Sequence, residues 1–345
     1  CRIMPEDNLA VRARLLKAGK VDSVGGEGGM AAEILMATGG YATKDGGPFA
    51  IRDFFPTMAT SLAVGFFTSG KSDIKSIWDI KKGVRIANFT AVPAMMKSYK
   101  ALLAWVGLKE EDAVFVPFGG YAASMRSISQ GKADIAFGQP VSPIILELES
   151  APGGIRWINM NPNASDKDKE GAERFREYLP TWYFCQNQMG VESAKGYWGM
   201  TSLAGNFVTA DADADFVYSL TKWTLESYDT IKTKHKMLFF KSPAAFKAAI
   251  TKSFIPLHEG AIRYAKEIGA WTAAEDQRQK YNVWLVDQYI SAYDKALAKA
   301  KADKIKIAYS DEKWIELWEG MKKDIPAIAV MPDEEIEKAV KKYNL

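Results

Sequence analysis

Side chains that could act as acids, nucleophiles or metal ligands are few in this sequence. The only histidines are His235 and His258, and the only cysteines are Cys1 and Cys185. No His-Glu-X-X-His, Gly-X-Ser-X-Gly or Walker sequence occurs. This count nearly excludes a metal site made of His or Cys ligands, and a catalytic pair of carboxylates cannot be located from spacing alone. We therefore expect a binding protein without cofactor or metal, and no catalytic residue.

Polar and small residues gather instead where predicted strands run directly into helices. The first turn of a helix presents unpaired backbone N–H groups and the positive end of the helix dipole, which together suit an anion. In an open α/β sheet, ligands bind outside the carboxyl ends of the strands. The candidate ligand-binding residues are Glu27, Gly28, Gly29, Asn88, Thr90, Ala91, Gly120, Tyr121, Gln139, Pro140 and Ser142.

Two stretches of the chain, residues 15–29 and 122–142, repeat one order of features. In each, a helix is followed by Gly-Lys-X-Asp, a short strand and a loop of small residues. Gly19 and Gly131 are placed to adopt the left-handed conformation that ends a helix. The repetition predicts two similar α/β lobes with a ligand held between them. We expect Gly131 and Asp134 to be structural, and the residues just beyond them to face the ligand.

Length and composition indicate an ordinary globular chain. With 345 residues, 48% apolar and 25% charged, it can bury a large core, and its length favours two domains. The formal charge of +3 lies near balance, without the concentrated basic face of a nucleic-acid-binding protein. No run of 18 apolar residues predicts a membrane span. We expect a monomer that does not bind nucleic acid.

Hydrophobic periodicity and helix-capping residues predict alternating strands and helices. Residues 25–29 are too rich in glycine for a strand interior, so they form either a tight turn or a close approach for another molecule. Asp73 is expected to cap a helix over residues 74–80. The predicted strands cover residues 1–4, 21–24, 61–67, 84–87, 114–117, 135–137, 156–160 and 198–208. The main predicted helices cover residues 9–16, 30–36, 95–106, 122–128, 144–148, 216–228, 246–250 and 273–301, with two more after residue 310.

One motif resembles a known family. The stretch Ile255-Pro-Leu-His-Glu-Gly-Ala-Ile-Arg-Tyr264 is similar to a Pro-Leu-His-X-Gly-Ala-X-Arg-Tyr signature of the TAXI-type solute receptors of TRAP transporters. The chain is also similar to that family around Asp22 and over residues 72–87, 127–137 and 215–222. The resemblance runs from the first residue to about residue 269.

This resemblance implies a type II periplasmic-binding-protein fold, with two α/β lobes joined by a hinge and a C-terminal helical extension. Residues 1–70 and 200–345 would form lobe I, and residues 71–199 lobe II. The protein would bind a small carboxylate, an amino acid or an oxo-acid, outside the cytoplasm, and deliver it to an ion-gradient-driven TRAP permease. The alternatives are a binding protein for an ATP-driven transporter or, third, an enzyme on the same fold.

The sequence departs from that family in two places. The chain begins after the family's first strand and Gly-rich turn, so it is either truncated or built differently there. Glu27 stands where the family often has Gln, and its carboxylate would favour a ligand amine over a second ligand carboxylate. His258 is expected to cap a helix or fix packing. Cys1 is either a lipid-anchor residue or an ordinary strand cysteine, and its pairing with Cys185 stays open.

Overall fold

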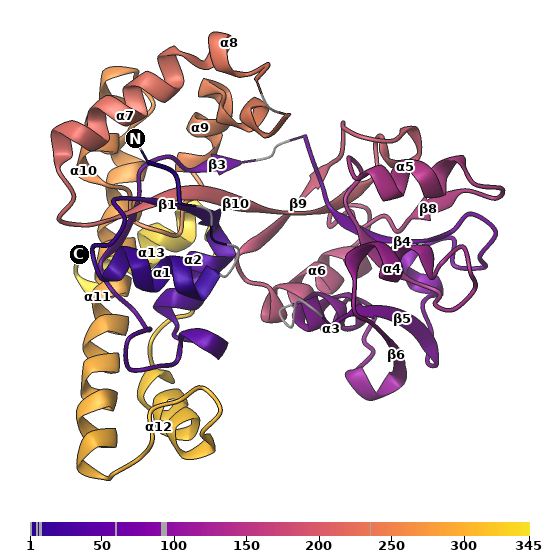
Figure 1. Cartoon of the computed structure of the whole chain (residues 1–345), viewed down its shortest axis with the longest axis horizontal. Helices are drawn as coiled ribbons and strands as arrows, with labels where there is room; N and C mark the ends of the chain where they lie inside the picture. The colour runs from indigo at the N-terminus through magenta and orange to yellow at the C-terminus, as the bar shows by residue number, and fades with distance from the viewer. Residues whose placement is uncertain (1, 5, 7–8, 59–60, 91–94, 235) are drawn as a thin grey trace. The chain divides into compact units, whose positions relative to one another are not determined.

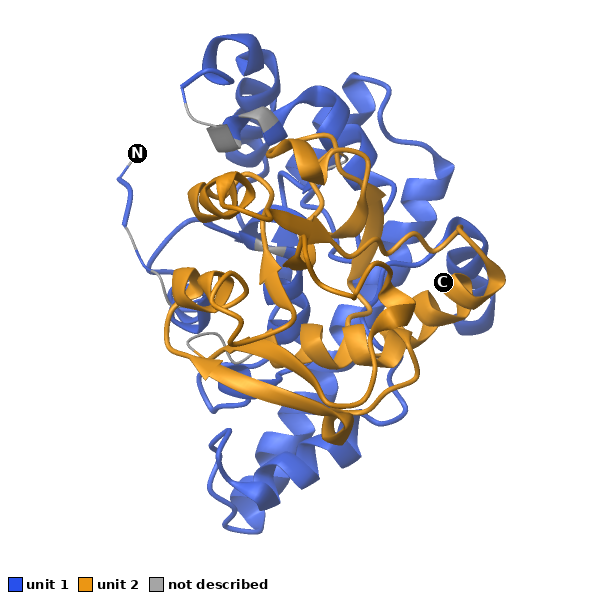
Figure 2. Cartoon of the chain, turned by 90° about the vertical axis from the view of Figure 1, so that its right-hand side faces the viewer, with its two compact units in different colours: residues 1–58, 202–345 blue, residues 59–201 orange. Residues whose placement is uncertain are grey.

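The computed structural model describes residues 2–4, 6, 9–58, 61–90, 95–234 and 236–345. The chain divides into two compact units, which are coloured separately in Figure 2. Unit 1 contains residues 1–58 and 202–345, and unit 2 contains residues 59–201. Each unit combines strands with helices, and a helical region ends the chain, so the predicted α/β class is confirmed. His235, Cys1 and Ala91 lie outside the described residues.

The first change of unit falls between residues 58 and 59, earlier than the boundary near residue 70 expected from the sequence. Strand β4 (Gly65–Ser69) explains the difference, because it lies between β7 (Ala136–Gly138) and β8 (Ile155–Trp157) in a sheet of unit 2. The second change falls inside the long strand β10 (Trp198–Thr209), between residues 201 and 202.

Unit 1 is built on an antiparallel sheet (Figure 1). The unit 1 part of β10 pairs with β1 (Val24–Glu27), β2 (Ile51–Asp53) and β3 (Thr57–Met58). Its helices before the C-terminal region are α1 (Leu9–Lys17), α2 (Gly28–Leu35), α7 (Ala214–Glu226), α8 (Tyr228–Ile231), α9 (Pro243–Ile250) and α10 (Glu259–Glu267), with 3-10 turns η1 (Gly39–Tyr41) and η5 (Lys236–Lys241).

Two expectations for the start of the chain are wrong. Residues 2–4 form no strand and are exposed. The strand expected over residues 21–24 begins only at Val24 and continues through the glycines to Glu27. A Cβ on Gly26 would lie 2.4 Å from the Met30 Cε of helix α2, so the end of this flexible side chain packs directly on the strand and would have to shift. Glycine inside a strand often marks such a close approach.

The signature around His258 forms a seam between α7 and α10. His258 is the N-cap of α10, and its Nδ1 accepts a hydrogen bond from the Gly260 N–H at 3.2 Å, which confirms the expected cap. A Cβ on Gly260 would lie 2.4 Å from the Ala214 carbonyl oxygen, so glycine permits close helix packing. The Arg263 guanidinium binds the Asp215 carboxylate at 2.8 Å. The most specific motif of the sequence is therefore structural in this fold.

Three helices follow residue 272 and belong to unit 1. They are α11 (Ala273–Ala302), α12 (Glu312–Lys322) and α13 (Asp333–Tyr343), which confirms the three helices predicted there. Thr272 begins α11 with a capping box to Glu275. The rings of Trp314 and Trp318 are fully buried, so α12 packs against the rest of the unit through large apolar side chains.

Unit 2 contains two kinds of strand pairing. The strands β7, β4 and β8 form an antiparallel sheet, whereas β5 (Val84–Phe89) and β6 (Ala113–Phe118) pair in parallel. Strand β9 (Trp182–Gln186) pairs with β10. The helices are α3 (Met95–Trp105), α4 (Tyr121–Arg126), α5 (Pro143–Ser150) and α6 (Asp166–Tyr178), with 3-10 turns η2 (Ile77–Asp79), η3 (Glu110–Asp112) and η4 (Glu192–Ala194).

The helix expected over residues 74–80 is reduced to the single turn η2, and Asp73 is not its cap. Ser76 begins the turn instead, and the Asp79 carboxylate accepts hydrogen bonds from the N–H groups of Lys75 and Ser76 at 3.0 and 2.7 Å. Gly83, in the left-handed conformation with a φ of 85°, then precedes β5.

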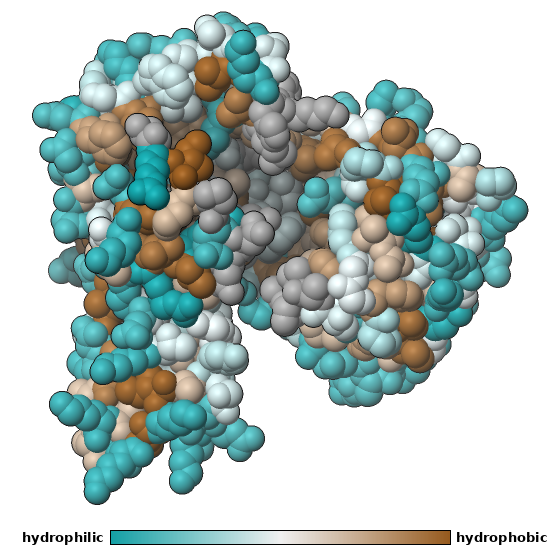
Figure 3. All heavy atoms as spheres, viewed as in Figure 1, coloured by the Kyte–Doolittle hydropathy of each residue, from teal (hydrophilic) through white to brown (hydrophobic). Residues whose placement is uncertain are grey.

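No helix in the described part of the chain is long and apolar enough to cross a membrane. In Figure 3, hydrophilic residues cover much of the visible surface of both units, and hydrophobic residues form scattered patches among the hydrophilic ones.

Candidate ligand-binding site

Three parallel segments of unit 2 end at one edge. Strand β5 lies between β6 and residue 135: Asn88 is opposite Pro117, and Ile86 forms a parallel bridge with Ile135. The Ala87 N–H donates to the Ile135 carbonyl at 2.8 Å. Residues 88–90, 119–121 and 139–142 therefore follow the carboxyl ends of neighbouring parallel segments. We call this region the carboxyl edge of unit 2.

Asn88 and Thr90 differ in the contacts of their side chains at this edge. The Thr90 backbone N–H and hydroxyl both donate to the Phe118 carbonyl, at 3.0 and 3.2 Å, and so tie the ends of β5 and β6 together. The Asn88 side chain is half-buried and has no hydrogen-bond partner within the described residues. Among the described residues, the Asn88 amide thus has no partner, whereas the Thr90 hydroxyl already donates its proton to Phe118.

Tyr121, the first residue of α4, contributes a buried phenol to this edge. Its ring packs against Phe89 with centroids 5.7 Å apart. Its hydroxyl is buried and has no hydrogen-bond partner of normal geometry among the residues described, although the Gln139 backbone N–H is directed toward it. Burial raises the pKa of Tyr121 to about 12, so the hydroxyl stays protonated and can donate at neutral pH.

The remaining candidates of unit 2 have mixed roles. A Cβ built on Gly119 or Gly120 would meet no described atom within 4 Å, so this turn borders open space. Gln139 is exposed, and Ser142 begins α5 without a side-chain capping hydrogen bond. Pro140 is buried, and its carbonyl accepts a hydrogen bond from the Val191 N–H at 3.1 Å, which gives it a packing role.

In unit 1 the candidates lie where β1 passes directly into α2. Glu27 ends the strand opposite Ala204, and Gly28 and Gly29 open the helix. Gly28 is buried, and a Cβ there would meet the Phe254 ring at 2.8 Å and the Leu203 carbonyl at 3.0 Å. This contact gives Gly28 a packing role, while the half-buried Gly29 lies in the first turn of α2.

The structure thus gathers the seven described candidates of unit 2 around the carboxyl edge and places the three candidates of unit 1 at the β1–α2 junction. Their roles as ligand contacts stay predictions. The sequence pattern identified these positions because each follows a strand. The pattern could not distinguish Asn88 and Tyr121, whose polar groups have no normal partner among the described residues, from Pro140 and Gly28, which serve packing.

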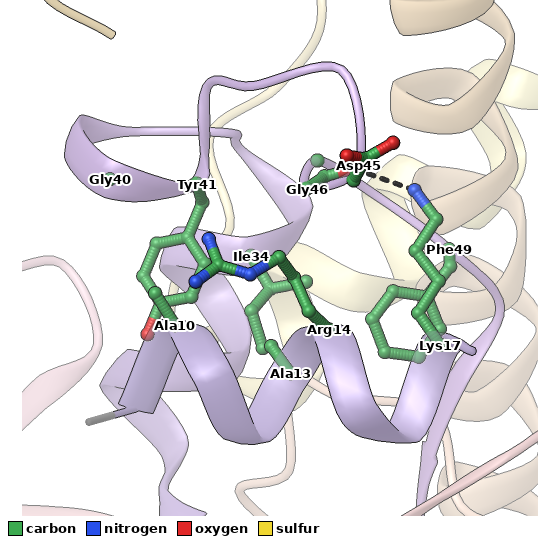
Figure 4. Close-up of a pocket in the computed structure, with 11 residues that line it drawn as sticks. Ala10, Ala13, Arg14, Lys17, Ile34, Gly40, Tyr41, Asp45, Gly46 and Phe49 are labelled. Carbon is green, nitrogen blue, oxygen red and sulfur yellow. Dashed lines mark hydrogen bonds between the residues drawn. The ribbon is translucent and has the colours of Figure 1, made fainter. Parts of the chain in front are cut away.

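Two hollows of unit 1 lie elsewhere. The one in Figure 4 is bordered by α1 and residues 40–49, and it is largely filled by side chains. There the Lys17 ammonium donates to the Gly46 carbonyl at 2.6 Å, and burial lowers the pKa of Lys17. The second hollow, of about 540 Å³, is open and is lined by residues that include Asp22, Asp211 and Asp213.

A buried polar cluster in unit 1 was not anticipated from the sequence. Asp53 is 4% exposed, and its Oδ1 accepts hydrogen bonds from the N–H groups of Phe55 and Asn206 at 2.9 and 3.1 Å. Burial raises the pKa of Asp53 to about 7 and lowers the pKa of the neighbouring Lys241 to about 8. Lys241 also donates to the Asn206 side chain and lies over the Phe55 ring. The only sequence signal is a charged residue directly before an apolar pair, Phe54 and Phe55.

Metal chemistry finds no support in the described residues, where no cluster of three or more His, Cys, Asp or Glu side chains is placed to hold an ion. The half-buried Cys185 is not an activated thiol, because burial raises its pKa to about 11.

Residues 11–269 match the NMT1-like family, and the chain belongs to that family. No curated protein sequence matches it. Among solved structures, the chain is similar to the periplasmic aliphatic sulphonate binding protein SsuA of Escherichia coli, at 15% identity over 80% of this chain and 73% of that one, with a TM-score of 0.40. It is also similar to a putative periplasmic sulfonate-binding protein SsuA of Methylobacillus flagellatus, at 14% identity, 97% and 79% coverage and a TM-score of 0.41. A third similar structure is an ABC-transporter periplasmic binding protein of Brucella ovis with glutathione bound, at 12% identity, 66% and 58% coverage and a TM-score of 0.29.

Proposed function

We propose that this protein is an extracytoplasmic solute-binding protein that captures a small organic anion and leaves it chemically unchanged. One observation carries the proposal: Asn88 and Tyr121 each present a polar group without a normal partner, among the described residues, at the carboxyl edge of unit 2, beside the open turn at Gly119 and Gly120. Membership of the NMT1-like family and the two α/β units are in keeping with it.

The chemistry of this edge suits an anion held by neutral donors. The amide N–H of Asn88, the phenol O–H of Tyr121 and backbone N–H groups are neutral donors, which suit oxygen acceptors. Hydrogen bonds to a charged acceptor are stronger than bonds between neutral groups. A carboxylate, of an amino acid or an oxo-acid, is the proposed ligand group, and a sulfonate offers the same acceptors.

The transporter partner is a membrane permease, and its class is a further part of the proposal. The resemblance around His258 pointed to a TRAP permease, but the matching family is the NMT1-like one, and the residues of that signature serve helix capping and packing in this fold. We therefore favour an ATP-driven transporter, the alternative raised by the sequence, over a TRAP permease. The genes next to the gene of this protein would distinguish the two. A neighbouring gene for an ATPase subunit would favour the ATP-driven transporter, and one for a TRAP permease would favour the TRAP system.

Binding is tested by calorimetry on the purified full chain with a panel of amino acids, 2-oxo-acids and alkanesulfonates. We expect one compound class to bind with one-to-one stoichiometry and to be recovered unchanged. Native mass spectrometry of the freshly purified protein first shows whether a ligand is retained. Conversion of a bound compound into product would contradict the proposal and favour an enzyme. If none of the three compound classes binds, the proposal of an organic anion as the ligand is wrong.

A further inference from the structure

The C-terminal helices lie beyond the part of the chain that matches the family, which ends at residue 269. They are nevertheless integral to unit 1, and four of their side chains donate hydrogen bonds to one short segment, residues 36–43. Trp318 and Lys322 of α12 donate to the backbone carbonyls at the start of this segment, and Trp314 and Tyr293 donate to carbonyls further along it. We call these four side chains the carbonyl clamp.

The first part of the clamp acts on the end of α2. Trp318 Nε1 donates to the Met36 carbonyl at 3.0 Å and to the Ala37 carbonyl at 3.2 Å, and Lys322 Nζ donates to the Met36 carbonyl at 3.2 Å. A cation near the C-terminus of a helix also interacts favourably with the helix dipole. The partners are protected from water, since Trp318 is fully buried.

The turn held by Trp318 is conformationally costly. Ala37 has a φ of 43°, a left-handed conformation that glycine usually supplies at the end of a helix. For a residue with a Cβ this conformation costs about 1–2 kcal/mol. Ala37 is 1% exposed, so water cannot satisfy its carbonyl in place of the clamp. The two tryptophan hydrogen bonds therefore stabilise a turn that the local sequence does not favour.

The second part of the clamp acts beyond this turn. Trp314 Nε1 donates to the Ala42 carbonyl at 2.9 Å, and the Tyr293 hydroxyl donates to the Thr43 carbonyl at 2.8 Å. A Cβ on Gly47 would lie 2.3 Å from the Tyr293 ring, so the following loop also packs closely on α11. Trp314 and Trp318 both lie in α12, are fully buried and donate through Nε1. They differ in the carbonyls that they bind, which are that of Ala42 for Trp314 and those of Met36 and Ala37 for Trp318.

Helix α2 connects the clamp to the candidate ligand site. It has eight residues, so its two ends are about 12 Å apart. Six of the eight are buried, which leaves the helix little freedom to bend. Its first turn contains Gly28 and Gly29, the candidates of unit 1. A displacement of the helix end at Met36 and Ala37 is therefore transmitted to the first turn.

We infer that Trp318, supported by Lys322, is a positioning residue: it fixes the end of α2 and thereby the place of the Gly28–Gly29 turn. The C-terminal helices are then part of the binding unit rather than an appended tail. This inference rests on the proposed function only in taking that turn as ligand-facing.

The test compares Trp318→Phe with Trp314→Phe in the full, ligand-free chain by residue-resolved amide hydrogen exchange. Each variant keeps an aromatic ring and loses one N–H donor. In an α-helix the N–H groups of Ala32 and Glu33 bond to the carbonyls of Gly28 and Gly29, so their exchange reports on the first turn of α2. We expect Trp318→Phe to speed exchange at these two amides by about tenfold. Trp314→Phe should instead act within residues 41–47 and leave them unchanged.

Equal effects of the two variants on Ala32 and Glu33, or no effect of Trp318→Phe there, would overturn the inference, because burial of a tryptophan would then matter only for general stability. Lys322→Met provides a milder variant if Trp318→Phe folds poorly, and it should change the same amides to a smaller extent. Since the readout needs no ligand, a failure of positioning is distinguishable from a failure of the proposed function, which the binding panel reports.

Discussion

The stretches 15–29 of unit 1 and 122–142 of unit 2 share their local sequence pattern but differ in their surroundings. In both, a glycine ends a helical turn in the left-handed conformation, with φ of 62° at Gly19 and 65° at Gly131. In unit 2 the next segment pairs in parallel with β5 through Ile135, whereas in unit 1 β1 pairs antiparallel with β10. The pattern therefore determines the turn, and the neighbouring strand determines how the next segment joins its sheet.

The aspartates of the two stretches show the consequence. Asp134 Oδ2 accepts hydrogen bonds from the Arg85 backbone N–H and from its guanidinium, at 2.8 and 3.1 Å. Asp22 is exposed and has no ion pair in the described part of the chain. In unit 1 the carboxylate that joins strands is Asp53 of β2, which accepts the Asn206 N–H of β10. In both units a carboxylate joins neighbouring strands: the partly exposed Asp134 in unit 2 and the buried Asp53 in unit 1.

The largest expected effect is the pH dependence of Asp53→Asn. Because burial raises the pKa of Asp53 in the folded protein to about 7, above its unfolded value of 3.8, its contribution to stability falls as pH rises from about 4 to 7. An asparagine keeps the acceptor for Phe55 and Asn206 but never carries the buried charge. Relative to the wild type, the variant should gain stability toward pH 7.5, by up to about 4 kcal/mol.

Urea unfolding at pH 4.5, 6.0 and 7.5 measures this difference. Lys241, whose pKa burial lowers to about 8, is the nearby cation and keeps its Asn206 contact in both proteins. A difference between variant and wild type that stays constant over this pH range would mean that Asp53 is not protonated preferentially in the folded state.

The next comparison is Asp134→Ala against Asp22→Ala. Removing Asp134 takes away the carboxylate partner of Arg85, whose guanidinium still donates to the Gly131 carbonyl at 2.9 Å, and should cost about 2 kcal/mol, the usual range for hydrogen bonds to a charged group. Asp22→Ala should change stability by less than about 0.5 kcal/mol, as for other exposed positions. Chemical denaturation at pH 7 measures both variants. Similar losses would show that Asp22 has a structural partner after all.

The pKa of Asp134 moves in the opposite direction to that of Asp53. Burial raises it, but the hydrogen bonds from Arg85 outweigh burial, so the folded pKa lies below 3.8. The stabilisation by Asp134 is therefore present above about pH 4 and is lost as pH falls through its folded pKa. The two variants should thus respond to acid with opposite signs.

A smaller effect concerns binding at the carboxyl edge of unit 2. Asn88→Ala and Tyr121→Phe should each weaken the binding of the panel ligand about tenfold, because each loses one donor to a charged group. Stability should stay within about 0.5 kcal/mol, since neither side chain has a normal hydrogen-bond partner in the described structure. Thr90→Val is the matched control, and it should lose stability through its bond to Phe118.

Calorimetry and thermal unfolding of these variants separate the two roles. Unchanged affinity in both Asn88→Ala and Tyr121→Phe would remove this edge from the site. An affinity lost only together with folding would give the two side chains a structural role.

The smallest effect should be the same in both stretches. Gly19→Ala and Gly131→Ala each place a Cβ on a left-handed residue, at a cost of about 1 kcal/mol. A Cβ would meet no described atom within 4 Å at either position, so strain is the only expected cost. Unfolding of the two variants measures it, with Asn substitutions as the milder pair. A clearly larger loss at one position would reveal a tertiary contact there.

Features that depend on neighbouring residues were predictable. The cap at His258 and the left-handed glycines Gly19 and Gly131 depend on groups within a few positions along the chain, so the sequence alone contains the partners. The α/β class followed from the alternation of such segments. The wrong expectations arose where the decisive contact was distant, as for β1, whose glycines accommodate Met30 of the next helix and whose partner is β10.

The sequence by itself therefore determined where turns and helix ends fall and which residues follow the strands. Only the tertiary structure decided which of those residues remain available for a ligand. Thr90 is engaged by Phe118 across two strands, while Asn88 has no such partner among the described residues. The structure also decided that Trp318 supports Ala37, a partner 281 positions away. The physical reason is that hydrogen bonds and close packing join residues that meet only after the chain has folded, and no spacing along the chain records those meetings.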